Sequence, residues 1–209
     1  QNQHEHNHII AVNIRVGDIV QGDKTGDKPL SDVVKEYNKD KYNKPGEVFL
    51  GVVHRLDRPT TGIVVFARTS KALTRLNDLF KNRETQKTYW AIVKNKPEND
   101  AATLEHFLVR NEKSNTSKAH LKEAANSKKA ILDYKIIASL NNYYALEIDL
   151  HTGRHHQIRS QLSAIGSPIK GDLKYGFDRS NPDGGIHLHA RKLTFDHPVT
   201  KESLTITAP

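Results

Sequence analysis

The 209-residue sequence contains no cysteine and no methionine. Without cysteine there is no disulfide bond, no thiol nucleophile and no cysteine-ligated zinc. A chain free of disulfides suits a reducing compartment, and we expect a cytoplasmic protein. The sequence does not explain the missing methionine.

Long apolar runs are also missing. No stretch approaches the roughly 18 apolar residues that a membrane span requires, and no charged-then-apolar leader resembles a signal peptide. Hydrophobic residues make up 36% of the chain and charged residues 27%, which is typical of a globular protein. We therefore expect one folded domain with a sizeable core and no membrane partner.

Negative charge is the scarcer sign. Asp and Glu number 24 against 32 Lys and Arg, so the formal net charge is +8. A basic domain without a membrane signal usually binds a polyanion, most often a nucleic acid. The alternative is that the lysines serve solubility alone.

The pattern of apolar residues predicts mixed strands and helices. Residues 1–8 are polar and are expected to form a disordered tail, whereas residues 9–209 show no repeat or linker and are expected to form a single domain. Alternating or apolar runs predict strands over 9–12, 63–67, 87–93 and 186–195. Helical spacing predicts helices capped by Ser31 and by Ser70, the second ending near residue 84, and a third over 155–165.

Two further segments bear on the fold class. Residues 111–128 hold few apolar side chains and are expected to form an exposed, lysine-rich loop. Two alternating arms flank Asn141-Asn142, which predicts an antiparallel hairpin with a tight turn. We therefore expect an α+β fold with a mostly antiparallel mixed sheet, flanking helices and a central basic cleft.

A polar cluster precedes the predicted strand at 63–67. It reads HRLDRPTTG, residues 54–62, and sets Asp57 between Arg55 and Arg58. Neighbouring arginines favour an ionised carboxylate, and a loop at the mouth of a strand is held firmly yet remains reachable. Asp57 can therefore be a nucleophile. The alternative is an aspartate that holds the loop through a salt bridge.

Tyr89 and two arginines could accompany this carboxylate. Tyr89 lies at the start of a predicted strand, and Arg154 and Arg159 lie around a predicted helix start. One arginine could pair with Asp57 while the other reaches solvent or phosphate. A half-buried strand tyrosine and a solvated helix start are the alternatives.

Four blocks of the sequence, in order, resemble the RluA family of pseudouridine synthases. HRLDRPTTG is similar to that family's H-R-L-D-x-x-T-S-G signature, and KTYWAIV, residues 87–93, to its K-x-Y-x-A strand. TGRHHQIRSQLSAIGSPIKGDLKYG, residues 152–176, resembles its T-G-R-x-H-Q-I-R and G-x-P-I-x-G-D-x-x-Y-G segment. IHLHARKLTFDHP, residues 186–198, resembles its closing strand.

The resemblance implies an isomerase that converts uridine in ribosomal or transfer RNA to pseudouridine without metal or cofactor. It places Asp57 as the catalytic aspartate, Tyr89 as the active-site tyrosine and Arg159 as the basic residue paired with the aspartate. It also implies that Arg55 helps to displace the target nucleotide. The remaining motif positions are expected to contact substrate: His54, Arg58, Thr61, Arg154, His156 and Gln157.

Some features depart from the family pattern. Thr61 replaces the usual serine but keeps the hydroxyl, and Asn13-Ile14-Arg15 stands where the family usually has N-K-P. We expect no separate RNA-binding module, so substrate choice would come from the loops of the catalytic domain, such as residues 111–128. A monomer is the default expectation, and the sequence does not identify the RNA or the uridine.

Three other functions are compatible with parts of the sequence. An inactive RNA-binding domain would keep the charge but would not need Asp57, Tyr89 and Arg159 together. A metal site could use His187 and His189, although strand histidines are more often structural. A glycosidase-like hydrolase would need a second carboxylate as acid, for which Asp172 is the nearest candidate.

Overall fold

The computed structural model describes residues 2–22 and 27–209. They cluster into two compact units, one of Gln1–Gln86 with Arg191–Pro209 and the other of Lys87–Ala190. The single domain expected over residues 9–209 stays a prediction. No helix in the described part of the chain is long and apolar enough to cross a membrane.

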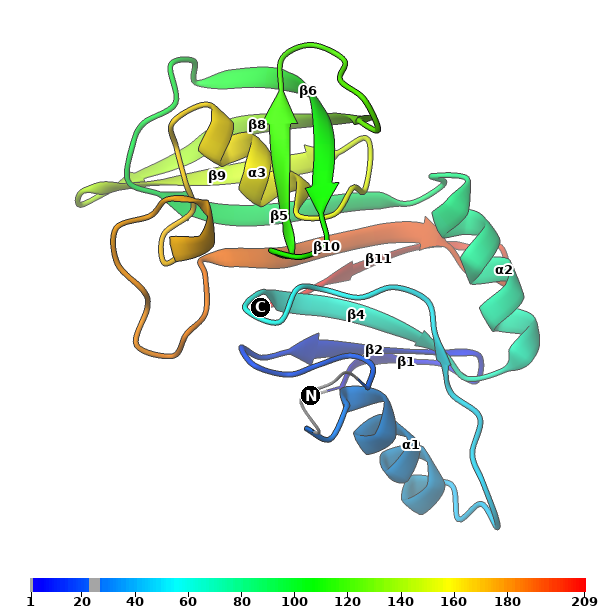
Figure 1. Cartoon of the computed structure of the whole chain (residues 1–209). Coiled ribbons are helices and arrows are strands. Elements are labelled where there is room, and N and C mark those ends of the chain that lie inside the picture. The colour runs from blue at the N-terminus through cyan, green and yellow to red at the C-terminus, as the bar shows by residue number, and fades with distance from the viewer. Residues whose placement is uncertain (1, 23–26) are drawn as a thin grey trace. The chain divides into compact units, whose positions relative to one another are not determined.

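The first unit is built on short antiparallel pairings (Figure 1). Strand β2 pairs with β1 and β4, β4 also pairs with β3, and β10 pairs with β11. The bounds are β1 (Asn2–Glu5), β2 (Ile9–Ile14), β3 (Gly51–Val52), β4 (Thr61–Ala67), β10 (Leu188–Asp196) and β11 (Ser203–Thr207). The first residues of β10 belong to the second unit.

Strands β2 and β4 are apolar on both faces. Ile9, Ala11, Ile63 and Val65 join one buried cluster, and the alternate residues of the same strands join another. Helix α2 (Ser70–Lys81) packs Ala72 and Leu76 into the first cluster, and α1 (Leu30–Lys41) packs Leu30 and Val34 into the second. Successive strand side chains point to opposite faces, so a helix on each face explains these near-continuous apolar runs.

The prediction of a disordered tail over residues 1–8 was wrong for residues 2–5, which form β1, while residue 1 lies outside the described residues. A polar sequence can form a strand because the pairing uses backbone groups. Glu5 adds a tie to α1, since its carboxylate accepts hydrogen bonds from Tyr37 Oη at 3.2 Å and Lys41 Nζ at 2.8 Å.

The helix boundaries differ from the predictions by a few residues. Helix α1 begins at Leu30 after Pro29, one residue before the expected cap Ser31. The cap of α2 is Thr69, whose side chain accepts a hydrogen bond from Ala72 N at 3.1 Å, and α2 ends at Lys81. Both threonine and serine are good caps, so the pattern alone could not choose between adjacent residues.

The second unit is an antiparallel sheet in the order β5-β9-β8-β6-β7. Its apolar face packs against Ile158 and Leu162 of α3, while Trp90 is 36% exposed. Figure 1 labels β5, β6, β8, β9 and α3. The elements are β5 (Gln86–Val93), β6 (Ala101–Asn111), β7 (Thr116–His120), β8 (Lys128–Leu140), β9 (Tyr143–Leu150), α3 (Gln157–Ala164) and the 3₁₀ helix η1 (Leu173–Tyr175).

The hairpin prediction is confirmed, because β8 and β9 pair up to Leu140 and Tyr143 around the Asn141-Asn142 turn. The prediction of a loop over residues 111–128 was wrong in its middle, where β7 pairs with β6. A strand can form with few apolar side chains, because the pairing uses backbone groups. The α+β fold class is confirmed, and every strand pair described above is antiparallel.

Candidate active site

The segment that carries Asp57 connects β3 to β4 in the first unit. A tight turn holds it, because Thr60 N donates to Asp57 O at 2.8 Å, and Gly17 N donates to Arg58 O at 3.1 Å. Gly62 has φ +124°, in the range that favours glycine. The Asp57 side chain is half-buried. The backbone therefore holds this carboxylate firmly and leaves part of it accessible.

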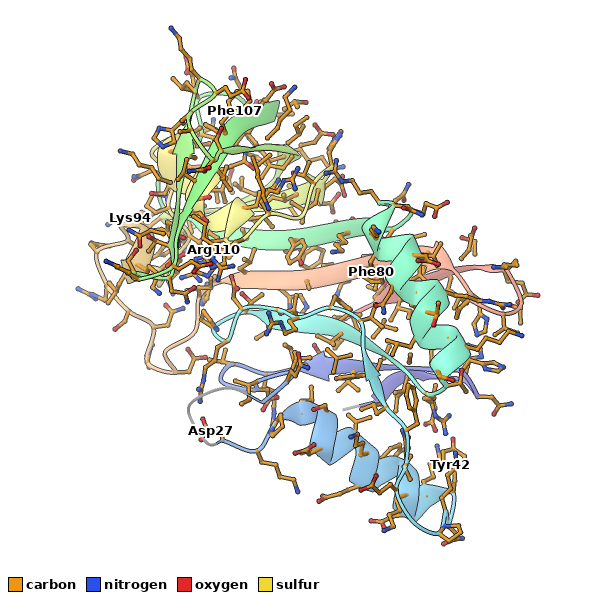
Figure 2. All side chains as sticks on the ribbon, turned by 45° about the vertical axis from the view of Figure 1, so that its right-hand side comes forward. Asp27, Tyr42, Phe80, Lys94, Phe107 and Arg110 are labelled. Atoms are coloured by element: carbon orange, nitrogen blue, oxygen red, sulfur yellow. The ribbon has the colours of Figure 1, made fainter. Side chains whose placement is uncertain are left out.

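His54 is tied into the first unit by its ring. Nε2 accepts a hydrogen bond from Val65 N at 3.0 Å, and the imidazole stacks on Phe80 of α2 at 4.8 Å between centroids (Phe80 is labelled in Figure 2). Since Nε2 accepts, a neutral ring carries its proton on Nδ1. These contacts anchor the loop that carries Asp57, and the expected substrate contact of His54 stays a prediction.

The two arginines beside Asp57 are exposed. Arg58 forms an ion pair with Asp27, which is labelled in Figure 2, and its side chain is 44% exposed. Arg55 is exposed, and Thr61 is half-buried at the start of β4. The expected substrate contacts of Arg55, Arg58 and Thr61 stay predictions.

Tyr89 lies on β5 of the second unit, opposite Ile148. It is half-buried and packs against the apolar cluster that includes Ile158. Lys87 shares its face of the strand, two residues earlier, and burial lowers the pKa of the Lys87 ammonium. A strand tyrosine packed in this way is fixed in place, while its exposed part can meet a ligand.

The T-G-R turn after β9 is held by Gln157. Its Oε1 accepts from Thr152 Oγ1 at 2.7 Å and from Arg154 N at 3.0 Å, and its Nε2 donates to Ile131 O at 3.1 Å. Arg154 Nε donates to Lys129 O at 2.9 Å. Gln157 is buried, so these bonds indicate a structural role, and the expected substrate contacts of Gln157 and Arg154 stay predictions.

Arg159 of α3 is the most enclosed charge of the expected set. It is 5% exposed and makes a bidentate ion pair with Asp172, which is 1% exposed. Nε lies 2.8 Å from Oδ2, and Nη2 lies 2.8 Å from Oδ1. Two parallel charge-assisted bonds fix a guanidinium in plane and direction. The motif predicts Asp57 as a partner of Arg159, and that pairing stays a prediction.

His156 and Tyr175 complete the surroundings of Arg159. His156 has φ +50°, a left-handed conformation that is uncommon outside glycine, and it caps α3. Its Nδ1 lies 2.6 Å from Tyr175 Oη, and its Nε2 lies 3.3 Å from Arg159 Nη1. The Arg159 guanidinium also lies 5.0 Å from the centroid of the Tyr175 ring. Helix α3 therefore begins at Gln157, two residues after the predicted start at residue 155.

Asp172 and Tyr175 are the residues that sequence reasoning undervalued. Both lie in the quoted GDLKYG block, residues 171–176, so a signal was present. The sequence pattern suggests only a general-acid role for Asp172 and no role for Tyr175. Among residues 2–22 and 27–209, no group of three or more His, Cys, Asp or Glu side chains is arranged to hold a metal ion.

The expected catalytic residues divide between the two units. Asp57 belongs to the first unit, whereas Tyr89 and Arg159 belong to the second, on β5 and α3.

Comparison with known proteins identifies the class. A family model described as RNA pseudouridylate synthase matches residues 8–164. The human RNA Pseudouridylate Synthase Domain Containing 4 has a similar structure, with a TM-score of 0.84 and 25% identity, covering 100% of this chain and 87% of that one. The chain therefore belongs to the RNA pseudouridylate synthase family, and the resemblance to the RluA type is confirmed.

Two bacterial relatives show the extent of the match. An uncharacterised RNA pseudouridine synthase of Chlorobaculum parvum is 34% identical over 176 residues, which cover 76% of this chain and 54% of the relative. A ribosomal large subunit pseudouridine synthase C of Rickettsia bellii is 31% identical over 207 residues, covering 98% of this chain and 66% of the relative. The chain thus spans about half the length of several curated relatives that it matches.

Proposed function

We propose that this protein is an RNA pseudouridine synthase that isomerises specific uridines in ribosomal or transfer RNA. The observation that carries the proposal is the buried Arg159, fixed by Asp172 within a chain whose family match also includes Asp57 and Tyr89. A buried, bidentate guanidinium is unusual for a residue that only binds phosphate on a surface. It suits a group that must hold one orientation beside a reacting carboxylate.

The chemistry balances without an external reagent. The bond from uracil N1 to ribose C1′ breaks, and a bond from uracil C5 to the same carbon forms. C5 loses one proton and N1 gains one, so nothing is oxidised or reduced. Water has to be excluded while the base is detached, because hydrolysis would otherwise release free uracil.

Each expected residue has a role in this scheme. Asp57 is the nucleophile, attacking either the base or the sugar carbon, and Arg159 keeps it ionised and aimed. Tyr89 stacks on the uracil, and its hydroxyl helps to remove the C5 proton. The target base has to leave its helix to be reached, and Arg55 fills or holds the displaced position.

The partner in this proposal is RNA, and the other motif residues contribute to its binding. His54, Arg58, Thr61, Arg154, His156 and Gln157 line the approach to the base, either by contact or by holding the loops that make contact. A net charge of +8 attracts the phosphate backbone. We further propose that the protein acts as a monomer in the cytoplasm and uses no metal.

The structure disfavours a hydrolase at this site. Such an enzyme would need a carboxylic acid able to donate a proton. Asp172 is 1% exposed, and both of its oxygens accept hydrogen bonds from Arg159, so the geometry does not present it to a leaving group. An inactive RNA-binding domain is the remaining alternative.

Pseudouridine mapping tests the proposal. Unmodified ribosomal and transfer RNA transcripts are incubated with wild-type protein, with D57N and with D78N, which changes an exposed aspartate of α2. Modified sites are read by carbodiimide labelling and primer extension. We expect the same new stops with wild type and D78N and none with D57N, whose RNA affinity should stay nearly unchanged.

Retained turnover in D57N would rule out the nucleophile assignment. RNA binding without any stop from the wild type would favour the binding-only alternative, and release of free uracil would favour hydrolysis.

A further inference from the structure

Tyr175 touches the arginine network in two ways, and neither is explained by the roles given so far. Its ring lies against the Arg159 guanidinium, with 5.0 Å to the centroid, and its hydroxyl lies 2.6 Å from His156 Nδ1. The same hydroxyl accepts a hydrogen bond from Ser117 N of β7 at 2.9 Å. Tyr175, His156, Ser117 and Arg159 are all buried.

The hydrogen bonds determine which nitrogen of His156 carries the proton. A guanidinium has only donors, so Nε2, at 3.3 Å from Arg159 Nη1, has to accept. The proton of the neutral ring is therefore on Nδ1, from which it is donated to Tyr175 Oη. The oxygen of Tyr175 has two lone pairs, and His156 and Ser117 supply one donor for each.

His155 and the turn before β7 hold the His156 ring in place. His156 stacks on His155 at 3.8 Å between centroids, and His155 Nδ1 lies 2.8 Å from Ser117 Oγ. His155 Nε2 lies 3.0 Å from Asn115 Oδ1 in the turn before β7. The stacked His155 thus holds the tilt of the His156 imidazole, the donor-only guanidinium of Arg159 sets its tautomer, and Tyr175 Oη accepts the Nδ1 proton.

We propose that Tyr175 is a positioning residue for the reaction, acting on Arg159 through the His156 imidazole. Asp172 holds two nitrogens of the guanidinium, and the Nδ1–H tautomer turns an acceptor toward the third. The inference rests on the proposed function, in which Arg159 aims Asp57. Without the Tyr175 oxygen, the Nδ1 proton loses its acceptor, and the ring is no longer held with Nε2 toward the guanidinium.

Y175F is the direct test, because it keeps the ring and removes only the oxygen. The matched control is Y134F, which removes a buried tyrosine hydroxyl of the same unit that donates to Asn99 O at 3.1 Å. With an RNA transcript that the wild type modifies, we expect Y175F to lower kcat about tenfold to a hundredfold and to leave KM within about twofold. Y134F should retain the wild-type kcat at a temperature where all three proteins are folded.

Nitrogen-15 NMR of the full chain gives a readout that does not depend on turnover. The His156 signals, assigned by their loss in H156Q, should show the Nδ1–H tautomer in the wild type. The Arg159 Nε–H signal should be sharp in the wild type and in Y134F, and shifted or broadened in Y175F. These spectra test the inference even if Y175F is too unstable for kinetics.

Three outcomes would overturn the inference: an Nε2–H or doubly protonated His156 in the wild type, an unchanged kcat in Y175F, or an equal loss of kcat in Y134F. If the wild type modifies no RNA while the spectra are as expected, the proposed function fails and the arginine network stands. If the wild type is active but the spectra contradict the Nδ1–H tautomer, only the positioning role fails.

Discussion

At the level of single residues, the pairing of Arg159 with Asp172 gives the aspartate of the GDLKYG block a structural role. Both side chains are nearly inaccessible, and two bonds of 2.8 Å join them. A buried ion pair is costly to form, but removing one partner leaves an uncompensated charge. Asp172 therefore has a task of its own, which is to keep Arg159 oriented and inside the fold.

Replacement of Asp172 by alanine should destabilise the protein strongly. We expect D172A to lower the free energy of unfolding by roughly 3–5 kcal/mol, because Arg159 loses its buried carboxylate. The control is D178A, since Asp178 is 73% exposed and lies 4.0 Å from Lys94, which is labelled in Figure 2. An exposed pair of this kind is worth at most about 1 kcal/mol. Urea denaturation measures both, and equal losses would contradict a special role for Asp172.

At the level of elements, α3 is attached to the sheet by a buried polar contact as well as by apolar packing. Gln161 Nε2 donates to His106 Nδ1 of β6 at 2.9 Å and lies 3.2 Å from Ala130 O and 3.4 Å from Leu104 O. The two carbonyls require the amide nitrogen on that side. His106 must therefore accept through Nδ1, which a protonated ring cannot do.

The sheet attachment of α3 should weaken in acid. Burial lowers the pKa of His106 below its ordinary 6.5, so between the lowered value and 6.5 the unfolded chain binds the proton and the folded chain does not. Stability is complete above 6.5 and falls as the pH drops through this window. H106N keeps an acceptor for Gln161 but does not titrate.

Urea midpoints measured from about pH 8 to about pH 5 should fall less in H106N than in the wild type, with the pH 8 values correcting for the change in packing. Parallel curves would show that His106 does not contribute to acid sensitivity.

At the level of the whole molecule, the excess of positive charge is the feature that bears on the partner. The net charge is +8. Residues 111–129 contain five lysines, and all of them are exposed: Lys113, Lys118, Lys122, Lys128 and Lys129. In the second unit β7 pairs with β6 in a hairpin, and β6 carries the labelled Phe107 and Arg110 in Figure 2. This hairpin is the segment where we expect substrate choice to be made.

RNA affinity should fall linearly on a double-logarithmic plot as salt rises, because bound counterions are released from the phosphates. The variant K118A/K122A should reduce the slope by about 1 to 2, since each phosphate contact contributes about 0.7 to 0.9. Fluorescence anisotropy with a labelled tRNA transcript measures the slope. K39A, on the exposed side of α1, is the control, and an equal effect per lysine would contradict a special role for the β6–β7 hairpin.

Much of the fold and of the family assignment could be predicted from local patterns. The strand at 63–67, the hairpin at Asn141-Asn142 and the apolar stripes of α2 and α3 depend on side-chain periodicity, which the chain carries wherever it folds. The motif blocks identified the family, because residue types and their order can be recognised in a sequence without knowing which residues are in contact. The exact helix caps and the strands β1 and β7 could not be predicted from these patterns. Neighbouring polar groups determine the caps, and backbone pairing determines the two strands.

The sequence by itself determined the class of the protein, its excess of positive charge and the residues that could perform the reaction. Only the tertiary structure decided their partners. Asp172 lies 13 residues from Arg159, and Ser117 lies 58 residues from Tyr175, so no local pattern could pair them. A buried charge needs an opposite charge that the tertiary fold brings close to it. The free-energy cost of leaving the charge unpaired is larger than the net free energy that the pair contributes.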